Sequence, residues 1–296
     1  MAVHNGAENL PDQLASIKEQ SLGNWRLIAG DDKSTDASRA VLNEFARMSS
    51  AEVVEGPGKG FVANFFSLLS LPGLQGPVAL SDQDDIWFPD KLERGLRALD
   101  EIDDQRPALY CCRRVNWWPR FNRRKPSRTF PAAPSFKNAL VENIAAGNTI
   151  ILNDAALRLV RSTLAAARDV PFHDWWLYLV ISGAGGQVIC DPKPSLLYRQ
   201  HEDNLVGQGE GFLASLKVKR GVWDGSYSQR IDRNIAALLR IKDVLTAENR
   251  DCLHDFAAAR NGDFTTRLSL MRKSGVYRQG LISRIGFWGA VCVAKV

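Results

Sequence analysis

Residues 25–36 read WRLIAGDDKSTD, and residues 77–85 read PVALSDQDD. In each stretch an apolar run typical of a short buried strand stops directly before a group of acidic side chains, and a helical pattern comes next. Strands that alternate with helices at this spacing predict an open, mainly parallel α/β sheet flanked by helices. The two acidic groups then lie at the carboxyl ends of strands, where such sheets bind ligands, so we expect them to line one crevice.

The same alternation extends outward over the first hundred residues and then becomes less regular. Strands are predicted over 25–31, 51–55 and 77–81, with helices over 8–20, 36–48, 61–71 and 90–103. Further strands are expected at 108–112, 148–153, 187–191 and 194–199, with helices at 154–167 and 175–183. Only helices follow, at 210–223, 228–248, 251–260 and 264–273. We therefore expect an α/β domain over 1–207 and a helical C-terminal region over 208–296.

The first strand of the sheet is short. An open sheet normally begins with a strand of about five to six residues, but only Ala2 and Val3 precede the turn-like residues 4–6. Either the true start lies upstream of Met1, or the sheet tolerates a stub.

Composition bounds the class of protein. A chain of 296 residues with 45% hydrophobic and 24% charged residues can bury a core and is not a disordered chain. Five cysteines without CxxC spacing indicate a reducing compartment. No leader and no run of about 20 apolar residues is found, so a cytoplasmic protein is expected. The net charge of +5 does not require nucleic acid as a partner, since an anionic ligand or membrane surface explains it equally well.

The second acidic group is the more informative one. Asp82, Asp84 and Asp85 fall within four residues. Helix capping explains one such carboxylate but not three, because the three repel one another. A bound Mg²⁺ or Mn²⁺ removes the repulsion, since these ions prefer carboxylate oxygens and leave other positions to water and substrate phosphate. For residues 31–36, capping and ligand binding are equally good explanations.

Residues 171–176 read PFHDWW and open an apolar helix. Asp174 is a good N-cap, and a carboxylate at this position is also what a general base for a hydroxyl group requires; both roles can hold at once. Trp175 and Trp176 either stack on a sugar ring or pack in the core. His173 is more simply explained as structural.

Two loops complete the set of candidates. No GxGxxG turn and no Walker phosphate loop is present, but GPGKG at 56–60 is either an anion-approach loop or a plain turn. Arg199 and His201, after a predicted strand, either lie in a solvated loop or meet diphosphate charge and metal on the crevice.

Taken together, seven strings resemble the family 2 glycosyltransferases of the GT-A fold, and within them the bacterial rhamnosyltransferase-like branch. They occur in that branch's usual order over roughly residues 1 to 207. The strings are HNGAENLPDQLASIKEQS, GDDKSTD, GKGFVANF, LSDQDDIWFPDKL, GNTIILN, HDWW and LYRQHEDNLVG.

The resemblance implies a donor site at the first and second acidic groups. Asn5 would contribute to nucleotide-sugar binding, and Asp31 and Asp32 would hold the base and ribose. Asp82 and Asp84 would form the Asp-x-Asp pair, with Asp82 nearer the ribose and Asp84 the metal contact.

The resemblance also implies the residues of the transfer step. Asp174 would be the catalytic base, and Trp175 would lie on the sugar side. Arg199 and His201 would face the diphosphate, with His201 also near the metal. One departure is Lys33, which stands where the family usually has glycine and could slightly reshape that loop.

These expectations combine into one activity. We expect an inverting, metal-dependent transfer of a sugar from a nucleoside diphosphate, dTDP- or UDP-linked, to a hydroxyl of a glycan or lipid-linked acceptor. By resemblance alone the sugar is rhamnose or another deoxyhexose, in O-antigen or other cell-surface polysaccharide synthesis. Two rivals are a non-catalytic sugar-nucleotide-binding partner of such a system and a nucleotidyltransferase, which would need a more basic phosphate loop than GPGKG.

The C-terminus carries a separate signal. Leu281, Ile285, Trp288 and Cys292 fall on one helical stripe, bordered by Arg272, Lys273, Arg278 and Arg284. This pattern predicts either a helix on the inner surface of the cell membrane or a helix packed on its own domain.

Overall fold

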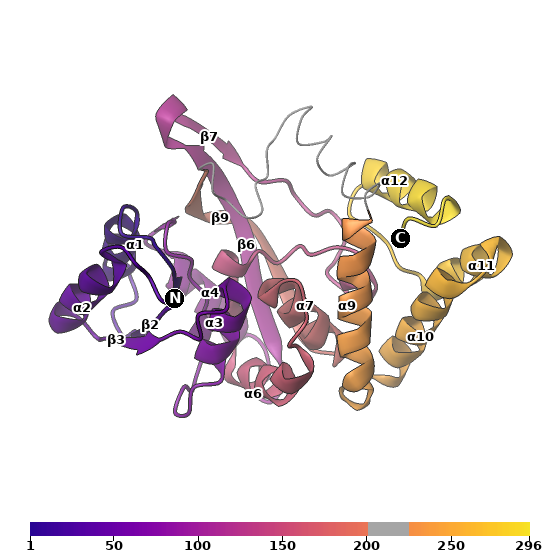
Figure 1. The fold of residues 1–296 in the computed structure, drawn as a ribbon, viewed down its shortest axis with the longest axis horizontal. Helices are drawn as coiled ribbons and strands as arrows, with labels where there is room; N and C mark the ends of the chain where they lie inside the picture. The colour runs from indigo at the N-terminus through magenta and orange to yellow at the C-terminus, as the bar shows by residue number, and fades with distance from the viewer. Residues whose placement is uncertain (201–224) are drawn as a thin grey trace.

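The computed structural model describes residues 1–200 and 225–296. The helix expected at 210–223 and the candidate His201 lie outside these ranges. Figure 1 shows an N-terminal α/β layer, a second sheet crossed by the long strands β6 and β9, and a group of C-terminal helices on the opposite side from the N-terminal layer. The α/β class and the helical C-terminal part are both confirmed.

The first sheet is entirely parallel. Its order is β1-β2-β3, and crossover helices connect its strands because parallel strands cannot be joined by a tight turn. The strands are β1 (Ala2–Val3), β2 (Leu27–Asp31) and β3 (Ala51–Glu55), and the helices are α1 (Leu10–Lys18), α2 (Ser38–Met48) and α3 (Phe61–Leu69).

The second sheet is mixed. Its order is β4-β8-β6-β9-β5, with β7 added to β6; β6 and β9 are parallel, and the other pairs are antiparallel. Its strands are β4 (Val78–Ala79), β5 (Ile86–Trp87), β6 (Ala108–Trp118), β7 (Arg123–Pro126), β8 (Ile151–Leu152) and β9 (Gln187–Arg199). Its helices are α4 (Lys91–Asp100), α5 (Phe136–Ala139), α6 (Asp154–Thr163) and α7 (His173–Gly183).

Strand β9 is longer than the sequence predicts. The two expected strands at 187–191 and 194–199 form one strand of 13 residues that includes Pro192 and Pro194. Proline cannot donate to a strand ladder. The strand continues nevertheless, because the register between β6 and β9 shifts at Cys112 and Arg113, where the ladder is interrupted in any case.

The two sheets meet at the short first strand. β1 pairs with Gly30 and Asp31 at the end of β2, and the Ala2 N–H donates to the Ser81 carbonyl after β4 at 3.2 Å. An apolar cavity of about 420 Å³ lies beneath this junction, lined by Met1, Leu27 and Trp87 among others. One backbone hydrogen bond therefore joins the two sheets beside the carboxyl end of β2, and an apolar cavity separates them beneath this junction.

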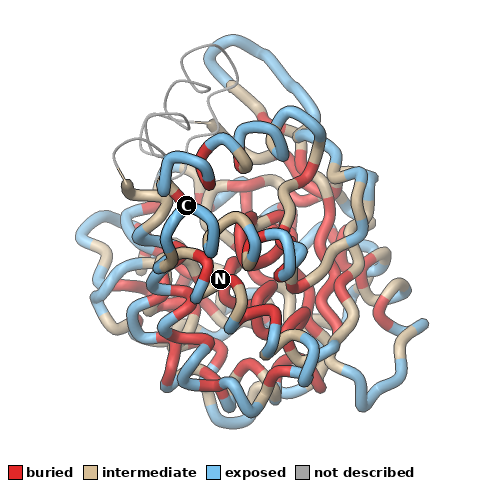
Figure 2. The backbone as a smooth tube through the Cα atoms, turned by 90° about the vertical axis from the view of Figure 1, so that its right-hand side faces the viewer, coloured by how far each residue is buried: buried red, intermediate tan, exposed pale blue. Residues whose placement is uncertain are grey.

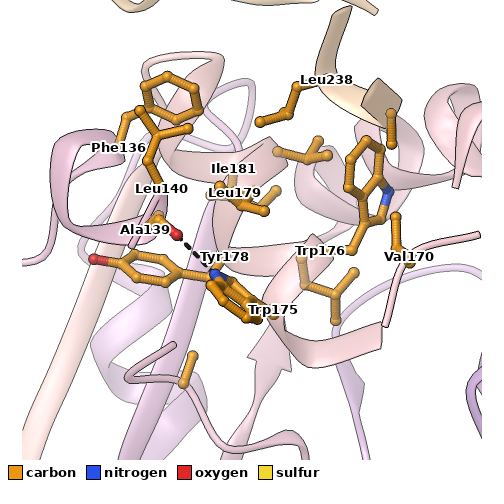
Figure 3. Close-up of a cluster of buried hydrophobic side chains, with 14 of the residues drawn as sticks. Phe136, Ala139, Leu140, Val170, Trp175, Trp176, Tyr178, Leu179, Ile181 and Leu238 are labelled. Atoms are coloured by element: carbon orange, nitrogen blue, oxygen red, sulfur yellow. Dashed lines mark hydrogen bonds between the residues drawn. The ribbon is translucent and has the colours of Figure 1, made fainter. Parts of the chain in front are cut away.

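Helix α7 forms the centre of the core. It is buried on every side, and Figure 3 shows residues of this helix, such as Tyr178 and Ile181, packed with Phe136 of α5 and Leu238 of α9. The C-terminal helices join the same buried cluster, so the body and the C-terminal region share one core, as the burial colours of Figure 2 illustrate. These helices are α9 (Ser226–Arg240), α10 (Ala247–Asn261), α11 (Phe264–Ser274) and α12 (Leu281–Cys292).

Candidate active site

The first acidic group closes the turn after β2. Asp31, which ends β2, accepts the Ser34 N–H at Oδ1 (3.2 Å), and its Oδ2 lies 3.7 Å from the Arg39 guanidinium. Asn5 binds the same turn from the end of β1, where its Oδ1 accepts the Thr35 N–H at 2.8 Å. The structure thus brings Asn5 and Asp31 together at the carboxyl edge of the first sheet.

Asp32 holds the glycine-rich loop. Its Oδ1 accepts the Gly58 N–H at 2.5 Å, and its Oδ2 accepts the Gly60 N–H at 2.8 Å. Those N–H groups are the donors that an external anion would need. Of the two explanations for residues 56–60, the structure favours a turn, closed on a carboxylate of the protein itself.

Lys33 has a left-handed backbone, with φ of 62°. Glycine adopts this conformation without strain, whereas a residue with a Cβ is destabilised by about 1–2 kcal/mol. The Lys33 side chain also fills the space beside Gly58, since a Cβ built there would lie 2.6 Å from the Lys33 Cδ. The lysine therefore keeps the turn that glycine would form, at the expense of backbone strain.

The loop at 82–85 is tied to the first strand by Gln83. The Gln83 Oε1 accepts the His4 N–H at 2.7 Å, and the Gln83 Nε2 donates to the His4 carbonyl at 3.0 Å. The side chain runs directly over Gly6, where a Cβ would lie 2.4 Å from the Gln83 Cδ. This reciprocal pair fixes the loop against the turn that follows β1.

Arg199 holds the same loop from the end of β9. Its Nε donates to the Asp84 carbonyl at 3.2 Å, and its Nη2 lies 2.8 Å from Asp12 Oδ2. Its guanidinium also stacks over the Trp117 ring, 4.6 Å from the centroid. The structure therefore places Arg199 at the Asp-x-Asp loop, with its guanidinium also in contact with α1 and β6, and its predicted role toward the diphosphate stays a prediction.

Asp85 and Lys91 are both buried behind the loop and are linked through Asn148. The Asn148 amide donates to Asp85 Oδ2 at 2.7 Å, and Lys91 Nζ donates to the Asn148 carbonyl. Lys91 also lies over the Trp87 ring at 4.1 Å. Burial, then the charges of the neighbouring acids, raises the pKa of Asp85 well above its usual range, and burial lowers the pKa of Lys91 to about 8. Lys91 therefore supplies part of the positive charge that offsets the acidic group.

Asp82, Asp84 and Asp174 form the acidic centre of the site. Burial, followed by repulsion from Asp84 and Asp174, raises the pKa of Asp82 to about 7. Arg114 opposes this rise, and its guanidinium is stacked on Tyr198 at 4.0 Å. Strands β4 and β6 and helix α7 thus bring two predicted donor-site acids and the predicted base within electrostatic range of one another.

Asp174 is not the N-cap that the sequence suggests. The helix begins one residue earlier, at His173, with Phe172 as N-cap, so Asp174 lies in the first turn. Its Oδ1 accepts the Trp175 N–H at 2.7 Å, and its Oδ2 accepts the Gly147 N–H at 3.0 Å. Burial raises the pKa of Asp174 to about 6, against the lowering effect of these hydrogen bonds. The carboxylate is therefore ionised at neutral pH and basic enough to accept a proton.

The aromatic residues beside Asp174 belong to the core. Trp175 is 5% exposed, and its indole N–H donates to the Ala139 carbonyl at 2.7 Å (Figure 3). Trp176 is fully buried, and His173 stacks on Phe65 with centroids 3.9 Å apart. Burial lowers the pKa of His173 to about 3, so its ring is neutral. For these three residues the structure favours the packing alternative, because α7 is enclosed on all sides.

Sequence reasoning missed four residues of the site. Gln83, Lys91, Arg114 and Asn148 carry charges or hydrogen bonds that order the acidic centre. A signal existed for Lys91, because it shares a helical face with Gly95 and other buried residues of α4. For Arg114 there was none, since β6 was expected to end at residue 112.

The donor set fits a divalent cation. Within the described ranges no group of three or more Cys, His, Asp or Glu side chains is arranged to hold a metal. However, Asp82 and Asp84 supply carboxylate oxygens, and the pKa of Asp82 is raised by burial and then by repulsion from Asp84, both of which a bound cation would offset. Hard oxygen ligands with one or two carboxylates are what Mg²⁺ and Mn²⁺ prefer, with water and phosphate at the other positions.

Solved structures share this architecture. TarS from S. aureus (residues 1–349), in complex with UDP-GlcNAc, superposes with a TM-score of 0.51 at 15% identity over 93% of this chain and 91% of that one. The mannosyltransferase PcManGT from Pyrobaculum calidifontis, in complex with GDP-Man and Mn²⁺, gives 0.53 at 16% identity over 99% and 84%. The GT-A fold expected from the sequence is confirmed.

Sequence relatives agree. The dTDP-rhamnosyl transferase RfbG of Shigella flexneri is 29% identical over 232 residues, which cover 73% of this chain and 77% of RfbG. The putative teichuronic acid biosynthesis glycosyltransferase TuaG of Bacillus subtilis is 32% identical over 103 residues, 33% of this chain and 39% of TuaG. The profile of Glycosyl transferase family 2 matches residues 1–158, more than half of the chain. The protein therefore belongs to glycosyltransferase family 2.

Proposed function

We propose that the protein is an inverting, metal-dependent glycosyltransferase that transfers rhamnose or another deoxyhexose from a dTDP- or UDP-sugar to a hydroxyl group. The observation that carries this proposal is the convergence of Asp82, Asp84 and Asp174 at the carboxyl edge of the sheet. The similarity to RfbG supports a dTDP-rhamnose donor. The acceptor would be a glycan or lipid-linked glycan of a cell-surface polysaccharide, and residues 1–207 would form the catalytic domain.

The residues divide the reaction between them. Asp174 would take the proton from the acceptor hydroxyl, whose oxygen attacks the anomeric carbon as the bond to the nucleoside diphosphate breaks. Asp82 and Asp84 would hold a Mg²⁺ or Mn²⁺ ion, which neutralises charge on the leaving diphosphate. Arg114 lies on the same acidic centre and keeps Asp82 and Asp174 more ionised than burial alone would. Attack from the face opposite the leaving group inverts the anomer.

A donor panel with calorimetry tests this proposal. Binding of dTDP-rhamnose and UDP-sugars should require Mg²⁺ or Mn²⁺, because without a cation two carboxylates face the diphosphate. Equal donor affinity in excess EDTA would exclude the metal role. Nucleotide release should accelerate only when a polysaccharide acceptor is added. Tight donor binding without any release would instead identify a non-catalytic sugar-nucleotide binder.

We also propose that α12 contacts the inner surface of the cell membrane. No helix among the residues described spans a bilayer. Phe287 and Val291 pack α12 onto the protein, whereas Leu281, Ile282 and Ile285 are 74%, 87% and 65% exposed. A helix with one packed face and one exposed aliphatic face suits the interface of a membrane. Replacing Ile282 and Ile285 by Asp should lower flotation with liposomes, and unchanged flotation would exclude this contact.

A further inference from the structure

A β-hairpin projects from the body of the molecule beside the site. It consists of the end of β6, a short helical turn (Pro119–Phe121) and β7, paired from Val115–Pro126 to Trp118–Arg123. Residues 119–126 are all exposed. Figure 1 shows the hairpin rising above the sheet, and Figure 2 shows its tip as an exposed loop at the top of the molecule.

The hairpin has one sign of charge. Residues 115–126 contain no Asp or Glu and four basic residues, Arg120, Arg123, Arg124 and Lys125. Two of the arginines stack on half-buried tryptophans of the hairpin. The Arg123 guanidinium lies 5.0 Å from the centroid of the Trp118 ring, and the Arg124 guanidinium lies 5.8 Å from that of Trp117. Phe121, at the tip, is 77% exposed. A folded strand pair thus presents arginines, indoles and one exposed ring on a single projection.

The hairpin is attached to the edge of the site. It continues from the carboxyl end of β6, where Trp117 is paired with Arg199 of β9 and stacked under its guanidinium. Arg199 in turn holds the Asp84 carbonyl. In Figure 1 the hairpin and α12 both lie toward the upper end of the molecule. A flat partner that meets the hairpin therefore lies on the side where the carboxyl ends of β6 and β9 open.

We propose that this hairpin docks on the anionic headgroups of a lipid bilayer. Clustered cations near such a surface strengthen binding, and aromatic side chains sit at headgroup level. A short apolar helix alone gives marginal membrane binding, so a basic second contact complements α12. The inference extends the proposed function, because it directs the site toward a bilayer that carries the lipid-linked acceptor.

The test uses the full chain with phosphatidylcholine vesicles, with and without phosphatidylglycerol. Arg123→Gln with Arg124→Gln removes two cations, and each cation is worth about fivefold in binding, so affinity for the anionic vesicles should fall about twenty- to thirty-fold. Arg26→Gln with Arg47→Gln removes the same charge from exposed positions before β2 and in the last turn of α2, and should change affinity less than about fivefold. Unfolding temperature and donor affinity report that each variant is folded.

A charge-preserving variant separates charge from hairpin structure. Arg123→Lys with Arg124→Lys keeps both cations and loses the guanidinium stacking, so it should restore most of the anionic-vesicle binding. Parent-like binding by the double Gln variant would overturn the proposal, as would an equal loss in the control pair or tighter binding of the hairpin to DNA than to vesicles. Because the Ile282 and Ile285 variants test α12 alone, and donor turnover tests the transferase, each failure would be recognised separately.

Discussion

The two acidic groups follow strands in the same way but use their carboxylates differently. In the first group, Asp32 accepts two backbone N–H groups and Asp31 accepts one and faces Arg39. In the second group, burial and then repulsion from Asp84 and Asp174 raise the pKa of Asp82 to about 7. The carboxylates of the first group therefore stabilise their own turn, while their predicted contact with base and ribose stays a prediction; in the second group burial and neighbouring acids make Asp82 harder to ionise.

The difference comes from the neighbouring backbone. The turn at 56–60 supplies N–H donors to Asp32, whereas the loop at 82–85 is held by the Gln83 side chain and by the Arg199 contact with the Asp84 carbonyl. Asp32 therefore stabilises its turn through backbone donors, whereas Asp82 is a buried acid whose pKa is raised, which is typical of residues at functional sites.

The largest expected effect is at Asp174. Asp174→Asn should lower kcat about 10² to 10⁴-fold, because general-base catalysis is lost. The amide accepts only one of the two backbone N–H groups, so a loss of about 1 kcal/mol in stability is also expected. Single-turnover transfer and calorimetric donor binding should show lost turnover with donor affinity within a few-fold. Near-normal transfer by a folded variant would place the base elsewhere.

Lys91→Met tests the buried pair behind the loop. It removes the cation that opposes the raised pKa of Asp85, which must then take up a proton or remain an uncompensated buried charge, so the free energy of unfolding should fall by up to about 3–5 kcal/mol. Adding Asp85→Asn should recover a large part of that loss, since the charge is then removed as well. Lys18→Met, on the exposed end of α1, should change stability by less than about 0.5 kcal/mol. Urea denaturation of the parent, Lys91→Met, Asp85→Asn and the double variant measures the coupling, and no recovery in the double variant would show that the two residues are not coupled.

The pH dependence of kcat tests the role of Asp174 in a second way. With donor and metal saturating, kcat should be constant at neutral pH and fall about tenfold per pH unit below about pH 6, because Asp174 acts only when deprotonated and its pKa is raised to about 6. The residual activity of Asp174→Asn should lack this acidic limb. A parent profile that stays flat through the same range would contradict the assignment.

Asp32→Asn breaks the structural group. The asparagine oxygen can accept only one of the N–H groups of Gly58 and Gly60, and the other then faces the asparagine NH₂ group, which is a donor. This should lower the free energy of unfolding by about 1–3 kcal/mol. Glu44→Gln, on the exposed face of α2, serves as the isosteric control. Chemical denaturation measures both. Parent-like stability of Asp32→Asn would show that the turn does not depend on this carboxylate.

The smallest effect is expected at Lys33. Lys33→Gly should raise stability by up to about 1 kcal/mol, because it relieves the left-handed backbone while increasing the freedom of the unfolded chain. Lys33→Ala keeps the strain and removes the side chain over Gly58, so it should not stabilise. Thermal unfolding compares the two, and a lower melting temperature for the glycine variant would mean that the side-chain contact outweighs the strain.

The first half of the fold could be predicted because its signals are local. The strands β2 and β3 and the helices α1 to α4 lie within the expected ranges, since amphipathic periodicity and acidic strand ends mark them. The hairpin at β7 and the continuous β9 could not be predicted, because arginine runs and prolines are poor strand signals.

The sequence was sufficient to predict which kinds of residue form the candidate site, but not which partners these residues contact. Aspartates after strands were sufficient to find the acidic centre, but the burial of Lys91 and Arg114 depends on partners far away in sequence. The same holds for Trp175, whose environment is set by α5 and not by its neighbours in the chain. Sequence pattern indicates which residues could react, and tertiary packing decides which of them remain accessible.

The Gln83–His4 pair has a consequence for the kinetics of donor capture. A loop held by this pair, by Arg199 and by Asn148 is already ordered before the nucleotide arrives. Less conformational entropy is then lost on association, which favours affinity through preorganisation. The donor therefore meets a surface that these residues have already ordered. Related donors should then have similar association rate constants and should differ mainly in their dissociation rate constants.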